Sequence, residues 1–315
     1  MKLIILIPAR NEEKTIGQVI RSIPRVKEFK DQQVLVVNDG SVDKTAEVAE
    51  KEGAIVVHHN ENKGLGAGFQ TLIAKALELG ADMAVMIDAD GQFPAKEIPK
   101  LIKPILEGRA DMVTACRFMR KSDIPKNISP IKLWGNRQVA RILSLLLGKK
   151  YKDVACGFRA YSKEALLNLN IFGRFTYTQE VFIDLSMKGL SILEIPIKVK
   201  YFKSRKSRVF KGAFDYATKS LLIIMRTVRD YKPLKFFGAI GVVLFLFGLI
   251  ADIFLLIHYI NNKQFTPYIS VGFLGAFLNI LGLIFFIVGF VADMLGKIRA
   301  NQEKLLYFEK KKLYS

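Results

Sequence analysis

Residues 83–92 read MAVMIDADGQ, an apolar run that passes directly into two carboxylates separated by one small residue. A short and wholly apolar run is typical of a strand in a sheet that is covered on both faces. Asp88 and Asp90, with the amide oxygen of Gln92, are the oxygen ligands that Mg²⁺ or Mn²⁺ prefers. An acidic surface turn has the same composition, but the apolar strand before these residues favours a metal site.

The same alternation of apolar runs and helix-length segments extends on both sides of this stretch. The other expected strands are 3–7, 34–37, 55–57 and 112–114, and the amphipathic segments between the strands are 12–23, 43–53, 66–79 and 95–106. This spacing predicts an α/β domain with a mostly parallel, doubly wound sheet. In such a sheet the loops that follow the strands lie along one edge, where ligands bind.

Polar and glycine-rich loops follow the predicted strands at that edge. They read PARNEE (8–13), NDGSVD (38–43), HHNENKGLGAG (58–68), DADGQFP (88–94) and ACRF (115–118). Asp39 is suited to accept hydrogen bonds from a ribose or a base, and Ser41 or Asp43 is suited to cap the next helix. The glycines of the third loop precede a helix, whose N-terminus suits a phosphate. A dinucleotide fingerprint is excluded, because its glycines belong after the first strand. His58 and His59 point opposite ways on an extended chain, so we do not expect them to share a metal.

Two long apolar stretches follow the α/β region. Residues 236–257 and 268–291 both reach the length of about 20 residues that spans a membrane core, and Asp252 is their one charged residue. We therefore predict two membrane-spanning helices, with Asp252 and Asn279 facing the partner helix or an interface. The chain carries a net charge of +19, and basic residues concentrate at 198–235 and after the second stretch. The positive-inside rule then places the α/β domain and both termini in the cytoplasm.

These features divide the chain into four expected parts. They are an α/β domain at 1–210, an amphipathic helix on the membrane surface at 211–233, a two-helix hairpin at 234–293 and a basic cytoplasmic tail at 294–315. Positive charge also suits nucleic acid, but no nucleic-acid-binding motif accompanies it and the adjacent spans account for the charge better. Cys116 and Cys156 lack the spacing of metal ligands, so we expect buried thiols in a reducing compartment.

In order and spacing, the loops resemble those of the family 2 inverting glycosyltransferases with the GT-A fold. Further segments resemble the dolichol-phosphate-mannose synthases and polyprenyl-phosphate glycosyltransferases: WGNR (134–137), DVACGFRAY (153–161), TQE (178–180), RKSR (205–208) and RDYKP (229–233). The resemblance implies a Rossmann-like GT-A catalytic domain followed by a two-helix transmembrane hairpin. It implies transfer of mannose, glucose or another hexose from GDP-mannose or a UDP-hexose to a dolichyl or polyprenyl phosphate, with inversion. The product would be a lipid-linked sugar donor for glycan assembly.

The resemblance also assigns roles to individual residues. Those expected to bind the nucleotide are Pro8, Arg10, Glu12, Asp39, Asp88, Ala89 and Asp90, with Ser207 and Arg208 on a loop that closes over the site. A divalent Mg²⁺ or Mn²⁺ is expected on Asp88, Asp90 and Gln92. The expected catalytic residues are Asp90, Arg117, Arg137, Asp153 and Arg205.

Charge indicates what such a site must do. A lipid monophosphate, with a second pKa of about 6, is already an anionic nucleophile and has little need of a general base. The metal would absorb the charge of the departing diphosphate, and arginines would bind phosphate oxygens. Asp153 is either a base, an acceptor-orienting group or a structural partner of Arg159. Glu180 is a weaker candidate for the same catalytic role, or it braces a helix.

Two other interpretations stay open. The first is a membrane-anchored protein that binds nucleotide-sugars without transferring them, against which the intact set of Asp88, Asp90 and Gln92 argues. The second is a transferase that acts on another lipid or glycan, such as a processive polysaccharide synthase. Those usually carry a Gln-x-x-Arg-Trp motif and more membrane spans than the two found here. The sugar, the nucleobase, the lipid length and the oligomeric state do not follow from the sequence.

Overall fold

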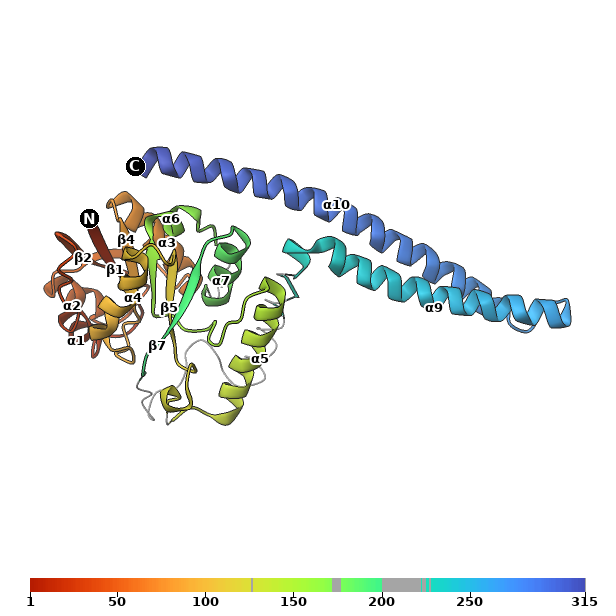
Figure 1. Ribbon diagram of the computed structural model, residues 1–315, viewed down its shortest axis with the longest axis horizontal. Coiled ribbons are helices and arrows are strands. Elements are labelled where there is room, and N and C mark those ends of the chain that lie inside the picture. Colours follow the sequence, from red (N-terminus) through yellow and green to blue (C-terminus); the bar gives the residue numbers. More distant parts are fainter. Residues whose placement is uncertain (126, 172–176, 200–221, 223–224, 227, 315) are drawn as a thin grey trace. The chain divides into compact units, whose positions relative to one another are not determined.

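The protein divides into two compact units. The computed structural model describes residues 1–125, 127–171, 177–199, 222, 225–226 and 228–314 (Figure 1). The first unit comprises Met1–Leu221 together with Leu306–Ser315, and the second comprises Leu222–Leu305. The first unit therefore takes in the predicted α/β domain and also the end of the predicted tail.

Among the described residues, the first unit is built on a seven-stranded sheet. The strands are β1 (Lys2–Ala9), β2 (Asp31–Asp39), β3 (Ile55–His59), β4 (Met83–Met86), β5 (Met112–Cys116), β6 (Arg159–Ser162) and β7 (Ile192–Pro196). They lie in the order β3-β2-β1-β4-β6-β5-β7, and β6 pairs antiparallel with β4 and β5 while the other pairs are parallel. The predicted mostly parallel α/β sheet is confirmed. The strands β6 and β7 were not predicted.

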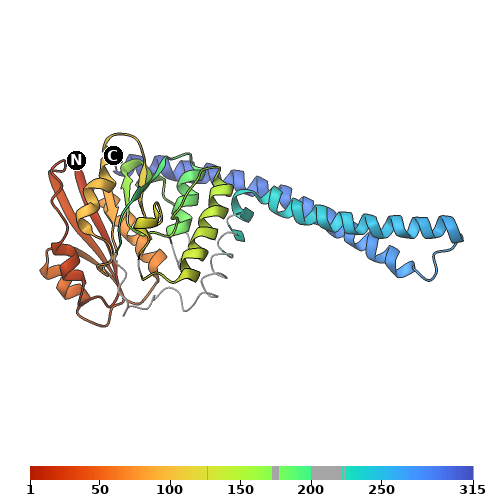
Figure 2. The same ribbon diagram turned by 60° about the horizontal axis from the view of Figure 1, so that its bottom comes forward.

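Helices cover both faces of the sheet (Figure 1 and Figure 2). They are α1 (Ile16–Arg21), α2 (Thr45–Lys51), α3 (Leu65–Glu78), α4 (Ile98–Leu106), α5 (Pro130–Leu147), α6 (Lys163–Asn168) and α7 (Thr178–Met187), with 3-10 turns η1 (Ala95–Glu97) and η2 (Lys121–Asp123). On one face, α1, α2 and α4 share an apolar cluster with Leu3, Ile5 and Ile7 of β1. Side chains alternate along a strand, so Ile4 and Leu6 point to the other face, where α3 packs on β1 and β2. The five side chains from Leu3 to Ile7 are all fully buried, which explains the unbroken apolar run.

The strand order brings the predicted loops together at one edge. β1 lies between β2 and β4 and is parallel to both, so the loops that follow these three strands are neighbours. The chain proceeds from β1 outward to β2 on one side and later returns to β4 on the other. Such a switch point is where open α/β sheets bind ligands.

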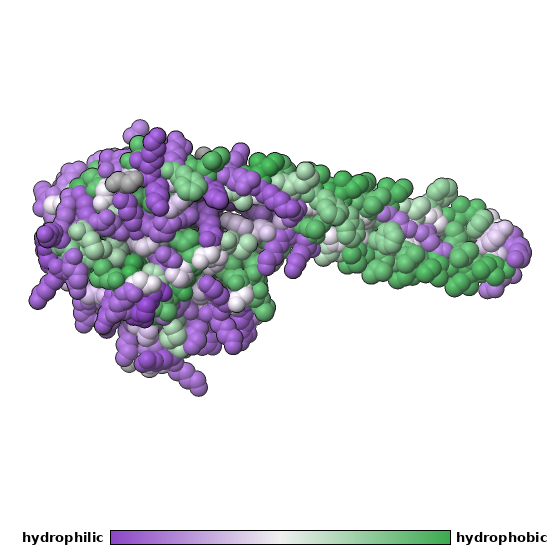
Figure 3. Space-filling view, turned by 45° about the horizontal axis from the view of Figure 1, so that its top comes forward, coloured by the Kyte–Doolittle hydropathy of each residue, from purple (hydrophilic) through white to green (hydrophobic). Residues whose placement is uncertain are grey.

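The second unit contains α9 (Pro233–Asn262) and α10 (Ile269–Tyr314), the last residues of which belong to the first unit. Both helices are long and apolar enough to cross a membrane, and Figure 3 shows apolar side chains covering them. They extend beyond the predicted spans, and α10 continues as a helix through the predicted tail. The predicted surface helix at 211–233 lies largely outside the described residues.

Facing glycines let α9 and α10 approach closely. A Cβ added to Gly241 would lie 2.8 Å from the backbone oxygen of Gly282, and one added to Gly248 would lie 2.8 Å from that of Gly275. In lipid, where the hydrophobic effect does not drive helices together, such close backbone packing is a main source of association. The glycines therefore hold the hairpin together.

Asp252 and Asn279 face each other within the hairpin. The Asn279 side-chain amide donates to Asp252 Oδ2 at 2.6 Å. A polar group in hydrocarbon is costly unless it finds a partner, and each of these residues supplies the partner of the other. The prediction that both face the opposite helix is confirmed.

We expect Gly282→Ala to destabilise the hairpin and Gly238→Ala to leave it almost unchanged. A Cβ at position 282 would meet the backbone of Gly241 at 2.8 Å, whereas one at 238 would meet only the Phe286 ring at 3.7 Å. Overpacking of this kind costs about 1–3 kcal/mol. Thermal unfolding of the two variants in detergent measures the difference, and equal melting temperatures would contradict the close glycine contact.

The two cysteines are buried and free, as predicted. Burial, reinforced by the charge of Glu194, raises the pKa of Cys116 far above its ordinary value, and burial raises the pKa of Cys156 to about 12. The thiolate is the reactive form. Both thiols should therefore resist iodoacetamide at pH 8 in the folded protein and react after unfolding, as counted by mass spectrometry.

The same pKa shifts predict how stability depends on pH. The folded state keeps both thiol protons at pH values where the unfolded state has lost them, which begins at about 8.5. Stability should then fall as the pH rises above that value. Rapid alkylation of either cysteine in the native protein would refute the burial on which both expectations depend.

Candidate active site

Asp88 and Asp90 lie in the turn that follows β4. Both are half-buried and Ala89 between them is buried. The backbone N–H of Gln92 donates to Asp90 Oδ1 at 3.0 Å, and Gly91 adopts a φ of +72° that favours glycine. The turn therefore fixes the Asp90 carboxylate at the carboxyl edge of the sheet. That it binds a metal or a nucleotide there stays a prediction.

A segment from a distant part of the chain closes over Asp88. A Cβ at Gly157 would lie 3.4 and 3.5 Å from the two Asp88 carboxylate oxygens and 3.0 Å from the Tyr177 hydroxyl. Burial raises the pKa of Tyr177, and the negative charge of Asp88 raises it further. Gly157 thus permits a close approach of backbone to carboxylate, and the tyrosine beside it keeps its proton.

The acidic turn fits a divalent ion that arrives with a substrate. Among the residues that the structure describes, no group of three or more His, Cys, Asp or Glu side chains is arranged to hold a metal. Asp88 and Asp90, with Gln92 nearby, offer an incomplete set of oxygen ligands. Mg²⁺ is usually bound by one or two carboxylates, with water and substrate phosphates completing its shell. The donor set therefore suits an ion shared with a diphosphate.

The loops after β1 and β2 are tied to each other. The Asn11 N–H donates to Ser41 Oγ at 3.0 Å, the Val42 N–H donates to Asn11 Oδ1 at 2.9 Å, and the Glu12 N–H donates to Thr45 Oγ1 at 2.7 Å. Asn11 itself has a φ of +52°, in the left-handed region that asparagine tolerates. These bonds hold the two loops together as one wall of the site.

The predicted nucleotide residues lie along this wall. Pro8 is half-buried near the end of β1, Arg10 is exposed just after β1, and the Glu12 carboxylate accepts a hydrogen bond from Thr15 Oγ1 at 3.0 Å. At the start of α2, Asp43 accepts the Thr45 N–H at 3.1 Å. Asp43 therefore accepts a backbone N–H at the start of α2, the role expected for Ser41 or Asp43.

Asp39 ends β2 and is buried. Its carboxylate accepts the backbone N–H groups of Lys63 at 2.9 Å and Gly64 at 3.0 Å, and it lies 2.8 Å from His59 Nδ1. These two N–H groups belong to the glycine-rich approach to α3, where we expected a phosphate. The Asp39 carboxylate occupies them instead, because it reaches them from the adjacent strand.

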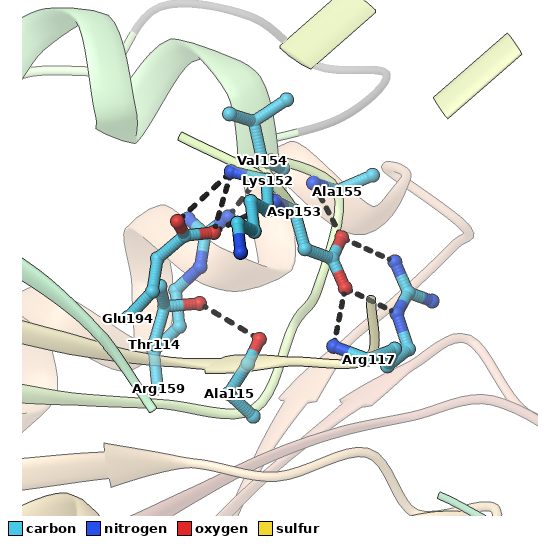
Figure 4. A network of polar contacts seen from close by, with 9 residues as sticks. All are labelled: Thr114, Ala115, Arg117, Lys152, Asp153, Val154, Ala155, Arg159 and Glu194. Atoms are coloured by element: carbon cyan, nitrogen blue, oxygen red, sulfur yellow. Dashed lines mark hydrogen bonds and ion pairs between the residues drawn. The ribbon is translucent and has the colours of Figure 1, made fainter. Parts of the chain in front are cut away.

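Arg117 follows β5 and forms a buried ion pair with Asp153 (Figure 4). Arg117 donates to the carboxylate from Nε and Nη2 at 2.7 Å each and from its backbone N–H at 3.0 Å, and the Ala155 N–H donates at 3.3 Å. The Asp153 side chain is fully buried and that of Arg117 is 8% exposed. Four donors fill the four acceptor positions of a carboxylate. In this arrangement Asp153 holds Arg117 in place and has no lone pair left to act as a base.

Glu194 on β7 holds the backbone of the segment that carries Asp153. Glu194 accepts the Asp153 backbone N–H at 2.7 Å and that of Lys152 at 2.9 Å (Figure 4). The alternative pairing of Asp153 with Arg159 does not occur, because Arg159 Nη2 donates to the carbonyl of Val154 at 3.1 Å. Burial raises the pKa of Glu194. The support thus runs from Glu194 through the backbone to Asp153 and on to the guanidinium.

Lys132, near the start of α5, is a charged neighbour that the sequence did not reveal. Desolvation lowers the pKa of Lys132, and the positive charge of Arg117 lowers it further. An anion beside Lys132 and Arg117 would relieve the repulsion between their charges. Arg137 lies further along α5 and is exposed. Nothing in the sequence marks Lys132 as a site residue, because it lies outside the predicted strand-end loops and outside the motifs that carry the resemblance.

Other predicted residues lack a described role. Arg205, Ser207 and Arg208 lie outside the described residues. Glu180 is half-buried in the first turn of α7, and whether it acts in catalysis stays a prediction.

With this geometry in place, comparison with known proteins identifies the family. Residues 4–169, more than half of the chain, match the family model for glycosyl transferase family 2. The chain belongs to glycosyl transferase family 2. This family 2 glycosyltransferase is 33% identical to the UDP-N-acetylglucosamine–dolichyl-phosphate N-acetylglucosaminyltransferase of Methanococcus voltae, over 72% of this chain and 97% of that one. It is 31% identical to a dolichyl-phosphate hexose transferase of Haloferax volcanii, over 62% of this chain and 81% of that one.

A solved structure shows the same fold. Glucosyl-3-phosphoglycerate synthase from Mycobacterium tuberculosis superposes with a TM-score of 0.55 at 23% identity, over 71% of this chain and 80% of that one. At this identity the likeness concerns the fold alone. The predicted GT-A fold of the family 2 domain is confirmed.

Proposed function

We propose that this glycosyltransferase moves a hexose from a nucleotide-sugar to a dolichyl or polyprenyl phosphate, with inversion at the anomeric carbon. The observation that carries the proposal is the pair of half-buried carboxylates, Asp88 and Asp90, at the switch point of the sheet. The names of the Methanococcus and Haloferax relatives support the lipid phosphate as acceptor. The two apolar helices in the same chain support a substrate that resides in a membrane.

On the donor side, the residues along the carboxyl edge would bind the nucleotide diphosphate. Asp88, Asp90 and Gln92 would hold Mg²⁺ or Mn²⁺, which when bound would neutralise charge on the departing diphosphate. The remaining donor-binding residues are proposed to be Pro8, Arg10, Glu12, Asp39 and Ala89. These contacts would fix the donor so that the anomeric carbon is open to attack from the opposite side.

On the acceptor side, positive charge must offset the repulsion between the acceptor phosphate and the donor diphosphate. Arg117 is oriented by its bonds to Asp153 and has Lys132 as its neighbour, so both can face a phosphate. Arg137, exposed on α5, would extend the same positive surface. Arg205, with Ser207 and Arg208, would close over the substrates. One direct displacement by the phosphate oxygen then gives the inverted product without a strong base.

We propose a membrane topology from the distribution of basic residues. Both termini and the family 2 domain would lie in the cytoplasm, because basic residues flank both apolar helices while the linker between them has one lysine. Nucleotide-sugars and a lipid phosphate would then meet on the cytoplasmic side.

The direct test is transfer by the full-length protein in detergent. Radiolabelled UDP-N-acetylglucosamine, UDP-glucose and GDP-mannose are each supplied with a polyprenyl phosphate and Mn²⁺. We expect chloroform-extractable label from at least one donor, and none when the lipid phosphate is omitted. Donor binding without lipid product would favour the binding-protein interpretation, and label in a water-soluble glycan would favour another acceptor.

A further inference from the structure

His59 contacts Asp39, and Thr71 contacts His59, but neither has a role in the site described so far. His59 is the last residue of β3 and lies directly beside Asp39 in the parallel pair. Its Nδ1 is 2.8 Å from Asp39 Oδ1, and its Nε2 is 2.9 Å from Thr71 Oγ1 on α3. The side chain of His59 is 6% exposed and that of Asp39 is 11% exposed. The imidazole therefore bridges the strand end to the helix inside the protein.

The chemistry of the partners assigns the proton that faces Asp39. A carboxylate only accepts hydrogen bonds, so His59 Nδ1 carries a proton and donates it. On the other side, Thr71 Oγ1 lies 3.1 Å from the carbonyl of Ala67 and can donate either to that oxygen or to Nε2. When the hydroxyl donates to Nε2, it holds the ring by a hydrogen bond. Thr71 thus fixes the ring orientation, and the ring fixes the carboxylate.

Counting lone pairs shows what Asp39 can still accept. Oδ1 receives the His59 Nδ1–H and the Lys63 N–H, and Oδ2 receives the Gly64 N–H. A carboxylate offers about four acceptor positions, two on each oxygen. Within the described part of the chain, one position remains, and it is on Oδ2.

A single acceptor position discriminates between nucleobases. This step rests on the proposed function, in which Asp39 binds the donor nucleotide, and it takes the base, rather than the ribose, as the group that Asp39 contacts. The hydrogen-bonding edge of guanine presents two adjacent N–H donors, which a carboxylate binds with one donor on each oxygen. The corresponding edge of uracil presents one N–H donor, at N3. Guanine would therefore leave a donor facing an oxygen that is already filled, and a buried unpaired polar group is strongly disfavoured.

We propose that His59 is a specificity-determining positioning residue: by filling Oδ1 of Asp39 it leaves room for one N–H donor, so the donor substrate is a uridine nucleotide and not a guanosine nucleotide. Thr71 acts through His59 by holding the ring in place. Neither residue touches the reacting atoms.

The test compares the binding of UDP and GDP to the full-length protein in detergent with Mn²⁺, by isothermal titration calorimetry. We expect UDP to bind at least about tenfold more tightly than GDP. His59→Ala opens Oδ1 to a second donor, so it should weaken UDP binding and bring the UDP-to-GDP ratio towards one. Thr71→Val, which removes the hydroxyl at nearly constant shape, should move the ratio in the same direction, and Thr71→Ser should preserve it. His58→Ala, a change to the exposed neighbouring histidine, is the matched control and should keep the original ratio.

Several results would overturn the inference. GDP binding as tight as UDP binding by the unaltered protein would do so. Equal weakening of both nucleotides in His59→Ala would also do so, because a merely structural role lowers both alike. If His59→Ala does not fold, the contrast between Thr71→Val and Thr71→Ser decides the question, and the same ratio in both would count against the inference.

The binding data are separable from the proposed function. Transfer to lipid from GDP-mannose with no preference for UDP would uphold the function and overturn the role of His59. A UDP preference that His59→Ala removes, in a protein that yields no lipid product, would uphold the role of His59 and reject the lipid acceptor.

Discussion

Replacing Asp90 with alanine is expected to lower sugar transfer by on the order of 10³-fold while the protein stays folded. The carboxylate is half-buried at the edge of the sheet, and its proposed task is to hold the metal that neutralises the leaving diphosphate. The apolar strand β4 before it is completely buried and does not depend on this side chain. The measurement is the initial rate of formation of chloroform-extractable label, with circular dichroism to confirm folding.

Two further variants sharpen this prediction. Asp90→Asn keeps the shape of the side chain and an acceptor for the Gln92 N–H, so we expect no loss of stability. It removes the negative charge that would hold the metal, so sugar transfer and Mn²⁺-dependent UDP binding should both be lost. Glu107→Ala is the acidic control. Glu107 pairs with Arg109 on the surface between α4 and β5, at the edge of the sheet opposite the carboxyl edge. Full transfer activity in Asp90→Ala would reject the metal assignment.

Replacing Asp153 with alanine is expected to destabilise the protein by about 3–5 kcal/mol. The change leaves the Arg117 guanidinium, only 8% exposed, without the carboxylate that compensates its charge. It also removes the acceptor for the Arg117 and Ala155 backbone N–H groups. Chemical denaturation of the variant in detergent measures the loss. A loss no greater than that of Glu107→Ala, which breaks an exposed pair of about 0–1 kcal/mol, would contradict the buried ion pair.

A double variant separates stability from catalysis at this pair. Arg117→Leu combined with Asp153→Ala removes both charges, so it should recover much of the stability that Asp153→Ala loses. Transfer should stay low in the double variant, because the guanidinium that we propose faces the acceptor phosphate is gone. A stable double variant with unaltered transfer would show that Arg117 serves the fold alone.

The sequence predicted the five strands that contain a short apolar run, β1 to β5, and missed β6 and β7, which contain charged residues. β1, β2, β4 and β5 contain apolar runs because helices cover both faces of the sheet. In contrast, β6 contains Arg159, which is fully buried with its guanidinium 4.8 Å from the Phe182 ring centre and 5.9 Å from that of Tyr177. β7 contains Glu194, which serves the Asp153 segment. The contacts that hold these two charged side chains come from other parts of the chain: a backbone carbonyl and aromatic rings for Arg159, and backbone N–H groups for Glu194. They leave no periodic signal in the strands themselves.

The same limit applies to the candidate site. Residues at strand ends were predictable, since the topology of a parallel sheet gathers them at one edge. Which residue holds which was not predictable, because Arg117 and Asp153 are separated by 36 positions and Asp39 and His59 by 20. The adjacent histidines were considered as metal ligands and rejected, and no sequence pattern pairs one of them with Asp39. Such contacts depend on the order of the strands in the sheet, which local sequence patterns do not reveal.

The glycine contacts of the hairpin have a consequence for its folding. Glycines recur at seven-residue intervals, at 241 and 248 on α9 and at 275, 282 and 289 on α10. A slip of one heptad would set Gly241 against Gly289 and Gly248 against Gly282, with backbone packing much as before. It would also move Asp252 opposite Phe286 and strand its carboxyl group in hydrocarbon. The two registers are therefore similar in glycine packing, and the hydrogen bond between Asp252 and Asn279 favours one of them.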